Sequence, residues 1–230
     1  MTAQTPDLDQ IWRRASFPTR ARSLRPSAGC QHIPELQTDA ISDQIATARW
    51  LYGCLLRAAA GHDNDAALAC MIASQSTGSG ALPRWLGLEP DAFRALLDHH
   101  FPGLGLEQLP EPTDHDRLDP ARQDEREALI ELMCAHHDEQ LPSAGWIAQI
   151  VAAGCMGSDH LWQDLGLWNR ADLTALMHRN FPALAARNVK DMKWKRFLYK
   201  QLCEAEDVVT CRAPSCEGCC DYHVCFGPEN

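Results

Sequence analysis

The sequence lacks the features that would place the chain in or on a membrane. No apolar run approaches the roughly 20 residues that a membrane-spanning helix needs. Arg13 and Arg14 are followed by Pro18 and further arginines, so this region also lacks the apolar core of a secretory signal. We therefore expect a cytoplasmic protein.

Two further absences narrow the functional class. Basic residues are not in excess, because the formal net charge is −10, and such a chain gains little from binding a polyanion such as nucleic acid. The sequence also has no Ser–His–Asp order, no glycine loop of the phosphate-binding type and no paired-carboxylate signature. We expect a carrier or binding protein and not an enzyme.

Lysine is scarce, and its distribution is uneven. All the lysines of the chain lie between positions 190 and 200, with Arg196 among them. Such a cluster attracts an anion, docks an acidic partner surface, or simply forms a solvated helix face. The candidate anion or partner contacts are Lys190, Lys193, Lys195 and Lys200.

Cysteine, in contrast, is plentiful, with 11 residues in the chain. An odd number of thiols in a reducing compartment is poorly explained by a disulfide framework and better explained by metal ligation. Near the C-terminus four cysteines have the spacing C-x₄-C-x₂-C-x₅-C, and soft thiolates bind zinc, copper(I) and iron–sulfur clusters well. The predicted metal ligands are Cys211, Cys216, Cys219 and Cys225.

The spacing leaves the kind of metal site open. Its first three cysteines match plant-type ferredoxins, whose fourth cysteine lies far downstream, so a simple electron-transfer ferredoxin is disfavoured. An iron–sulfur-type cluster, a structural zinc site and a redox dithiol remain as alternatives. Cys220 is a spare thiol or an alternative ligand, and His223 and His160 are further candidate ligands.

The pattern of apolar residues predicts an all-α fold. From about Ile41 apolar residues recur at three- and four-residue spacing, as in a helix with one buried face. We expect a compact helical bundle of two similar units, although helix-end signals can also coincide by chance. The matching signals are Gly78-Ser79, Leu86-Gly87-Leu88 and Phe101-Pro102 in one unit, and Gly157-Ser158, Leu165-Gly166-Leu167 and Phe181-Pro182 in the other.

The predicted organisation has five parts. The last part is a basic helix, with Asn188 as its predicted N-cap, followed by an irregular cysteine loop. The parts are a mobile N-terminal arm (1–40), a first helical unit (41–104), an acidic Pro-rich linker (105–122), a second helical unit (123–187) and the basic helix with its loop (188–230).

The C-terminal part of the chain resembles the NifQ family of nitrogen-fixation proteins. The resemblance is specific from about residue 145 onward and loose before it. It is carried by Asp191-Met-Lys-Trp-Lys-Arg-Phe-Leu-Tyr-Lys-Gln-Leu-Cys203-Glu, the four spaced cysteines, Cys225-Phe-Gly-Pro-Glu229, the run from Cys155 to Leu167, and Asn180-Phe-Pro-Ala-Leu184.

The resemblance implies a molybdenum–iron–sulfur cluster and a role as a molybdenum donor. Family members are described as supplying molybdenum to the nitrogenase iron–molybdenum cofactor, on the scaffold NifEN with the reductase NifH. Three thiolates suffice to hold three irons, so we expect Cys211, Cys216 and Cys219 to bind iron and Cys225 to differ in role. The alternative function is an α-helical interaction module with a structural zinc site.

Overall fold

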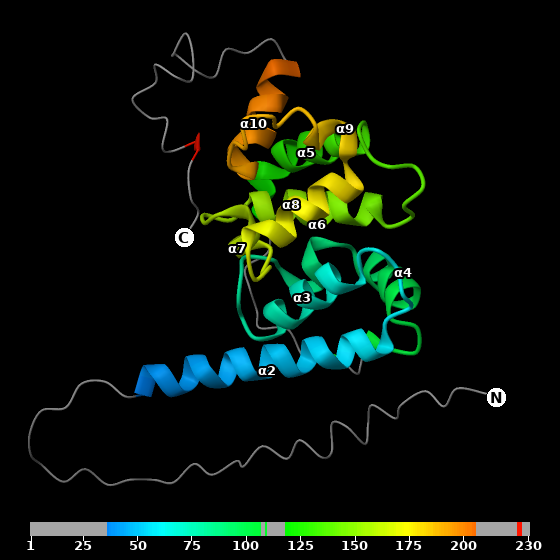
Figure 1. Cartoon of the computed structure of the whole chain (residues 1–230), viewed down its shortest axis with the longest axis vertical. Coiled ribbons are helices and arrows are strands. Elements are labelled where there is room, and N and C mark those ends of the chain that lie inside the picture. Colours follow the sequence, from blue (N-terminus) through cyan, green and yellow to red (C-terminus); the bar gives the residue numbers. More distant parts are fainter. Residues whose placement is uncertain (1–35, 107–108, 110–117, 206–224, 227–230) are drawn as a thin grey trace, which may run out of the picture.

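The computed structural model describes residues 36–106, 109, 118–205 and 225–226, and the regular structure in these ranges is helical (Figure 1). The prediction of a compact all-α fold is therefore confirmed. No described helix combines the length and the apolar character that crossing a bilayer requires. The described elements are α2 (Leu36–Ala58), α3 (Asp65–Ser76), η1 (Arg84–Gly87), α4 (Pro90–His100), η3 (Pro120–Arg122), α5 (Gln123–Cys134), α6 (Ala144–Cys155), α7 (Leu161–Asp164), α8 (Arg170–Asn180), α9 (Pro182–Ala185) and α10 (Trp194–Ala205).

Helices α3 and α6 form the centre of the core because both are apolar around most of their circumference. Leu68 and Met71 of α3 are fully buried, as are Ile147 and Val151 of α6. Helix α2 packs on α3, α5 packs on α6, and α10 packs on α5. Consequently α2 and α10 lie at opposite ends of the molecule, with the two central helices between them (Figure 1).

Corresponding elements occur in the same order in the two halves of the sequence. Helices α3 and α6 follow the N-cap residues Asn64 and Ser143, and each is succeeded by a short helix and then by α4 or α8. Phe101 and Phe181 end α4 and α8 with nearly the same backbone angles, φ −134° and ψ 64° or 58°. The structure thus contains a repeated helical motif.

The two copies of this motif contact each other reciprocally through small residues. Gly87 and Gly166 both have positive φ angles, 82° and 69°, which glycine adopts at little cost. A Cβ atom at Gly87 would lie 2.6 Å from the Cβ of Ala153, and one at Gly166 would lie 2.6 Å from the Cβ of Ser74. Each Leu-Gly-Leu segment therefore lies directly against the central helix of the other copy.

A buried polar network also joins the two copies. The Asn64 side-chain amide donates hydrogen bonds to Ser143 Oγ and to Asn180 Oδ1, both at 2.8 Å, and the Asn180 amide returns one to Asn64 Oδ1 at 3.0 Å. All three side chains are buried, so their polar groups depend on these partners. The network fixes the start of α3 against the end of α8.

The last helix begins later than the sequence predicts, so the assignment of Asn188 as its N-cap is wrong. The Asn188 side chain instead accepts a hydrogen bond from the Met192 N–H at 2.8 Å, within a turn. Asp191 has a positive φ of 51°, and Arg170 donates two hydrogen bonds of 2.8 Å to its carboxylate. Helix α10 therefore starts only at Trp194, and basic residues occupy its first turn.

Candidate functional site

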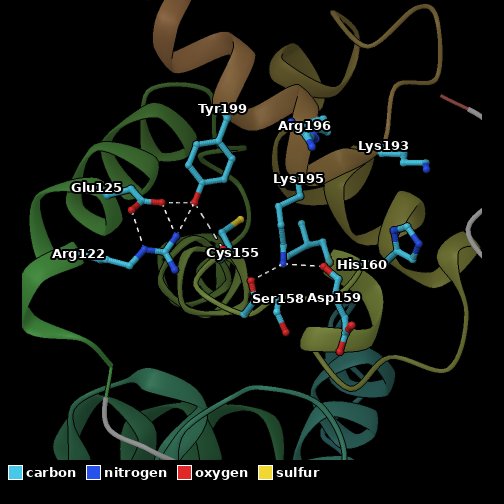
Figure 2. Close-up of a pocket in the computed structure, with 12 residues that line it drawn as sticks. Arg122, Glu125, Cys155, Ser158, Asp159, His160, Lys193, Lys195, Arg196 and Tyr199 are labelled. Atoms are coloured by element: carbon cyan, nitrogen blue, oxygen red, sulfur yellow. Dashed lines mark hydrogen bonds and ion pairs between the residues drawn. The ribbon is translucent and has the colours of Figure 1, made fainter. Parts of the chain in front are cut away.

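A pocket of about 740 Å³ lies where the first turn of α10 faces the end of α6 and the start of α5 (Figure 2). Residues 157–161, the loop after α6 together with the first residue of α7, form a second wall and are called the 157–161 loop below. Four basic and two acidic side chains belong to the lining, although the chain as a whole is acidic. They are Arg122, Lys193, Lys195 and Arg196, and Glu125 and Asp159.

One side of the pocket is held by Arg122, Glu125 and Tyr199. Arg122 donates two hydrogen bonds to the Glu125 carboxylate, at 2.6 and 2.8 Å, and the Tyr199 hydroxyl of α10 donates a third. Arg122 also donates to the Met156 carbonyl at 2.8 Å, just after α6. The hydrogen bonds from Arg122 lower the pKa of Glu125, and burial raises the pKa of Tyr199. The cluster therefore connects three elements while its charges balance.

Lys195 holds the opposite side of the pocket. Its ammonium group donates to the carbonyls of Gly157 and Asp159, at 3.0 and 2.8 Å, and pairs with the Asp164 carboxylate. The Asp164 side chain is only 3% exposed, so its charge depends on this partner. Three oxygen acceptors thus surround Lys195, and they tie the 157–161 loop to α10.

Cys155 lies at the inner end of the pocket, at the end of α6. It is 1% exposed, and burial raises the pKa of its thiol to about 12. The thiolate is the form that binds metals and acts as a nucleophile, so a thiol that stays neutral at pH 7 does neither well. Cys155 therefore serves the pocket as a small apolar wall.

The last cysteine of the motif is attached to the helical body beside this pocket. The Cys225 carbonyl accepts a hydrogen bond of 2.8 Å from the backbone N–H of Lys193, immediately before α10. Phe226, the next residue, is 4% exposed and belongs to the hydrophobic core. Cys225 itself is half-buried. The end of the cysteine motif is therefore anchored next to the basic side chains of the pocket.

The other predicted site residues are distributed as follows. His160 precedes α7 and lines the pocket, as does Lys193. Lys190 is exposed in the turn before α10, and Lys200 is not part of the lining but pairs with Glu204 at 3.1 Å. The remaining predicted ligands, Cys211, Cys216, Cys219, Cys220 and His223, lie outside the described residues.

Within the described ranges, no three His, Cys, Asp or Glu side chains are arranged to hold a metal ion. The rings of His62 and His99 stack at 4.2 Å with His100 beside them, a ring contact and not a metal site. A metal centre that includes Cys225 therefore needs further ligands from the part of the cysteine motif beyond these ranges.

Sequence reasoning missed the side of the pocket that Arg122, Glu125 and Tyr199 form. Arg122 falls in the predicted linker, and Tyr199, to which it donates a hydrogen bond, is 77 residues away in the chain. Long-range pairs of this kind leave no local pattern. The local signals were the basic cluster that contains Lys193, Lys195 and Arg196, and the run from Gly157 to His160, which belongs both to the repeat and to the segment that resembles the NifQ family.

The fold and the site together define an all-α protein that carries a cysteine motif anchored beside a basic pocket. A family model described as NifQ matches residues 67–227, a range that includes all four motif cysteines. The chain belongs to the NifQ family, which is associated with nitrogen fixation, and the resemblance noted in the sequence is confirmed.

Curated relatives agree with this assignment. The chain is 44% identical over 167 residues to Protein NifQ of Azotobacter vinelandii, covering 69% of this chain and 86% of that protein. It is 35% identical over 154 residues to Protein NifQ of Rhodobacter capsulatus, covering 67% and 82%. With Protein NifQ of Klebsiella pneumoniae it shares 37% identity over 153 residues, covering 65% and 90%. No solved structure matches the chain significantly.

Proposed function

We propose that this protein is a cytoplasmic metal carrier that binds molybdenum with an iron–sulfur cluster and donates it for biosynthesis of the nitrogenase iron–molybdenum cofactor. It acts as a carrier and not as an enzyme. Family membership supports the proposal because the matched range spans the whole cysteine motif. The structural observation that carries it is the anchoring of Cys225 beside the basic pocket.

Cys225 fits the role of a cluster ligand. Unlike Cys155, which is buried, Cys225 is half-buried at the edge of the hydrophobic core. Its backbone is nevertheless fixed to the start of α10. Under the proposal, Cys211, Cys216 and Cys219 complete the ligand set. Four thiols of one short motif suit an iron–sulfur cluster, because thiolates are the usual ligands of such clusters.

A bound iron–sulfur cluster supplies the sulfide ligands and electrons that molybdenum needs before it joins a metal–sulfur cofactor. The chain's own contribution is to hold the motif at the edge of a rigid helical body. Three thiolates can hold three irons, and the fourth position is then open to molybdenum. Cys225, the motif cysteine next to the pocket, is the one that we propose differs in role from the other three.

A carrier must also release its cargo, and the position of the motif suits release. A structural zinc site is closed by its protein ligands, whereas Cys225 is hydrogen-bonded to Lys193, a residue that lines the pocket. The basic stretch 190–200 is a candidate docking surface for an acidic partner. The proposed partners are the assembly scaffold NifEN and the reductase NifH.

Metal analysis of protein purified without oxygen tests this proposal. We expect brown protein that contains iron, labile sulfide and molybdenum. Alanine at Cys211, Cys216 or Cys219 should lower both metals, whereas Cys225→Ala should lower molybdenum more than iron. Cys134→Ala is the matched control, because it removes a half-buried thiol of α5 outside the motif.

Two results count against the proposal. Colourless protein with one zinc ion per chain and neither iron nor sulfide establishes the structural zinc alternative. Equal loss of iron and molybdenum at all four motif positions contradicts the separate role of Cys225.

A further inference from the structure

We infer that the outward side of α2 binds a second copy of this chain, with the two α2 helices packed side by side and antiparallel. The inference goes beyond the proposed function and does not depend on it. Helix α2 precedes residues 67–227, the range that the NifQ family model matches, and none of the residues that line the pocket belongs to it. The proposed metal site therefore assigns this helix no role.

One side of α2 is packed, and the opposite side faces away from the molecule. Ala48, Leu51 and Leu55 are buried, and α2 packs on α3. A helix turns by about 100° per residue, so Gly53 lies nearly opposite Leu51. Because α2 runs along one end of the molecule (Figure 1), the side that contains Gly53 is directed outward.

This outward side exposes large apolar residues. Ile45, Trp50 and Leu56 are 49%, 37% and 38% exposed. A surface helix ordinarily carries polar residues on the side away from the core. Exposed apolar residues that follow one another along a helix mark a surface that gains free energy when another apolar surface covers it.

Two small residues, Ala46 and Gly53, lie between these large ones. They are seven positions apart, so they lie on one line along the helix. Gly53 is inside α2 and is not among the glycines with a positive φ, and among the described residues a Cβ there would meet only the Arg57 guanidinium, at 3.7 Å. Glycine weakens a helix interior, and these surroundings do not require it. A second helix at a close interaxial distance, about 8 Å, does.

The charges of α2 are arranged to match a second, antiparallel α2. Asp43 and Arg57 are both exposed, and they lie seven residues before and seven residues after Trp50. In an antiparallel pair centred on Trp50, each Asp43 lies opposite Arg57 of the second copy. A parallel pair would instead bring like charges together at both ends, which is unfavourable. The charges therefore favour the antiparallel arrangement.

The apolar and small residues are arranged around the same centre. Ile45 lies five residues before Trp50 and Leu56 six after it, while Ala46 lies four before and Gly53 three after. Ile45 thus meets Leu56 of the second copy, and each small residue meets the other. A two-fold axis makes every contact occur twice, so the interface closes at a dimer. The outward side of α2 is therefore complementary to itself.

The size of this contact indicates a reversible dimer. Helix α2 has 23 residues and is roughly 34 Å long. One pair of such helices gives an interface at the lower end of the size range of specific interfaces. The fraction of dimer should therefore depend on the protein concentration.

Sedimentation equilibrium of the full-length protein under reducing conditions, from about 1 to 100 μM, tests the inference. A second sample carries serine at the proposed metal ligands, so that a metal shared by two motifs cannot join the chains. We expect a reversible equilibrium between monomer and dimer in both samples. The replaced ligands are Cys211, Cys216, Cys219 and Cys225.

Charge reversal tests the antiparallel arrangement. Asp43→Arg alone and Arg57→Asp alone each place like charges at both ends of the pair, so each should raise the dimer Kd by about tenfold or more. A mixture of the two variants should form a mixed dimer, because opposite charges then face each other at both ends. Glu131→Arg, at an exposed position of α5, is the control and should change the dimer Kd by less than about twofold.

A substitution at Gly53 tests the close approach of the helices. Gly53→Gln should raise the dimer Kd by about tenfold or more, because its side chain keeps the two helices apart. Thermal unfolding of the monomer should be unchanged or shifted upward, because glutamine is the better helix former. Gly145→Gln is the matched control in α6, where a Cβ meets nothing within 4 Å, and it should leave the dimer unchanged.

Four outcomes overturn the inference. They are a monomer at every concentration, a dimer that disappears when the motif cysteines are replaced, failure of the two charge variants to form a mixed dimer, and an unchanged dimer in Gly53→Gln. A monomer at every concentration would show that another segment of this chain or a different protein covers the outward side of α2. None of these outcomes depends on which metal the motif binds.

Discussion

At the scale of single residues, the basic side chains at and near the start of α10 have three different environments. Lys195 is surrounded by oxygen acceptors from the 157–161 loop and by Asp164. Lys193 and Arg196 line the pocket. Lys200 forms a surface pair with Glu204, four residues further along the same helix. In the sequence these residues form one basic stretch. Their different environments arise only when the chain folds, because a helix directs neighbouring side chains toward different surroundings.

His100 is a second residue whose environment has a measurable consequence. It is fully buried, and its Nδ1 lies 2.6 Å from Asp65 Oδ1. Burial lowers the pKa of His100 below its ordinary value of 6.5, and Asp65 opposes this effect. The folded protein therefore resists protonation of this ring, whereas the unfolded chain accepts a proton near pH 6.5. The stabilising contribution is complete above that pH and is lost as the pH falls.

We predict that His100→Asn reduces the pH dependence of stability. Below pH 6.5 the wild type should lose up to about 1.4 kcal/mol per pH unit through this residue, and the variant should not. Asparagine suits the position because Asn180 occupies the corresponding place at the end of α8. Urea unfolding between about pH 5.5 and 7.5, roughly one unit either side of the ordinary histidine pKa, measures the slope. His137→Asn, at an exposed position, is the control. Equal slopes for wild type and His100→Asn contradict the assignment.

At the scale of elements, the loops that follow η1 and α7 are set by glycine. Gly166 combines a positive φ with close contact to Ser74 of the other copy, whose hydroxyl donates to the Gly166 carbonyl at 2.6 Å. Any other residue at this position would strain the backbone, and its Cβ would clash with the Cβ of Ser74. The element that would shift is α7, which directly follows the 157–161 wall of the pocket.

We therefore predict that Gly166→Ala lowers the free energy of unfolding by roughly 2–4 kcal/mol, from overpacking and from the left-handed conformation. Chemical denaturation measures the change. Gly145→Ala is the matched control, since a Cβ atom at this position of α6 meets nothing within 4 Å. It should leave stability unchanged or slightly raised. Similar losses for the two variants would show that the close contact with Ser74 does not determine the effect.

At the scale of the whole molecule, the sequence predicts the helices better than it predicts how they meet. Periodicity identified the all-α class, and the repeated Leu-Gly-Leu and Phe-Pro signals have matching places in the structure. These signals depend on residues close together in the chain, so they can be recognised from a single sequence. The pocket was not predicted, because Arg122, Glu125 and Tyr199 meet only after α5 and α10 have packed together.

The start of α10 shows a second limit of sequence reasoning. Asn188 is a good N-cap in isolation, and Asp191 falls where a first-turn acid is expected. The distant Arg170 instead binds the Asp191 carboxylate, and the chain turns there before the helix begins at Trp194. A tertiary ion pair outweighs the local signal. This shift is what places the basic residues at the pocket.

The attachment of the cysteine motif to the helical body yields a last prediction. Phe226 is buried in the core and follows Cys225, whose carbonyl binds the Lys193 N–H. Truncating a buried phenylalanine costs about 3–5 kcal/mol when the structure stays closed. Detaching residues 225–226 from the helices should require less free energy than unfolding the whole protein. We therefore expect Phe226→Ala to detach this segment while the helices stay folded.

Amide hydrogen exchange measures this detachment directly, because the Lys193 amide loses its acceptor. In Phe226→Ala we expect faster exchange at Lys193 and unchanged exchange in the central helices α3 and α6. Under the proposed function we also expect faster loss of iron to a chelator. Val189→Ala is the control, since Val189 is 85% exposed. Unchanged exchange at Lys193 with unchanged metal retention would show that the anchor does not hold the proposed metal-binding motif. Slower metal loss alone would show that the anchor strains the site instead of supporting it.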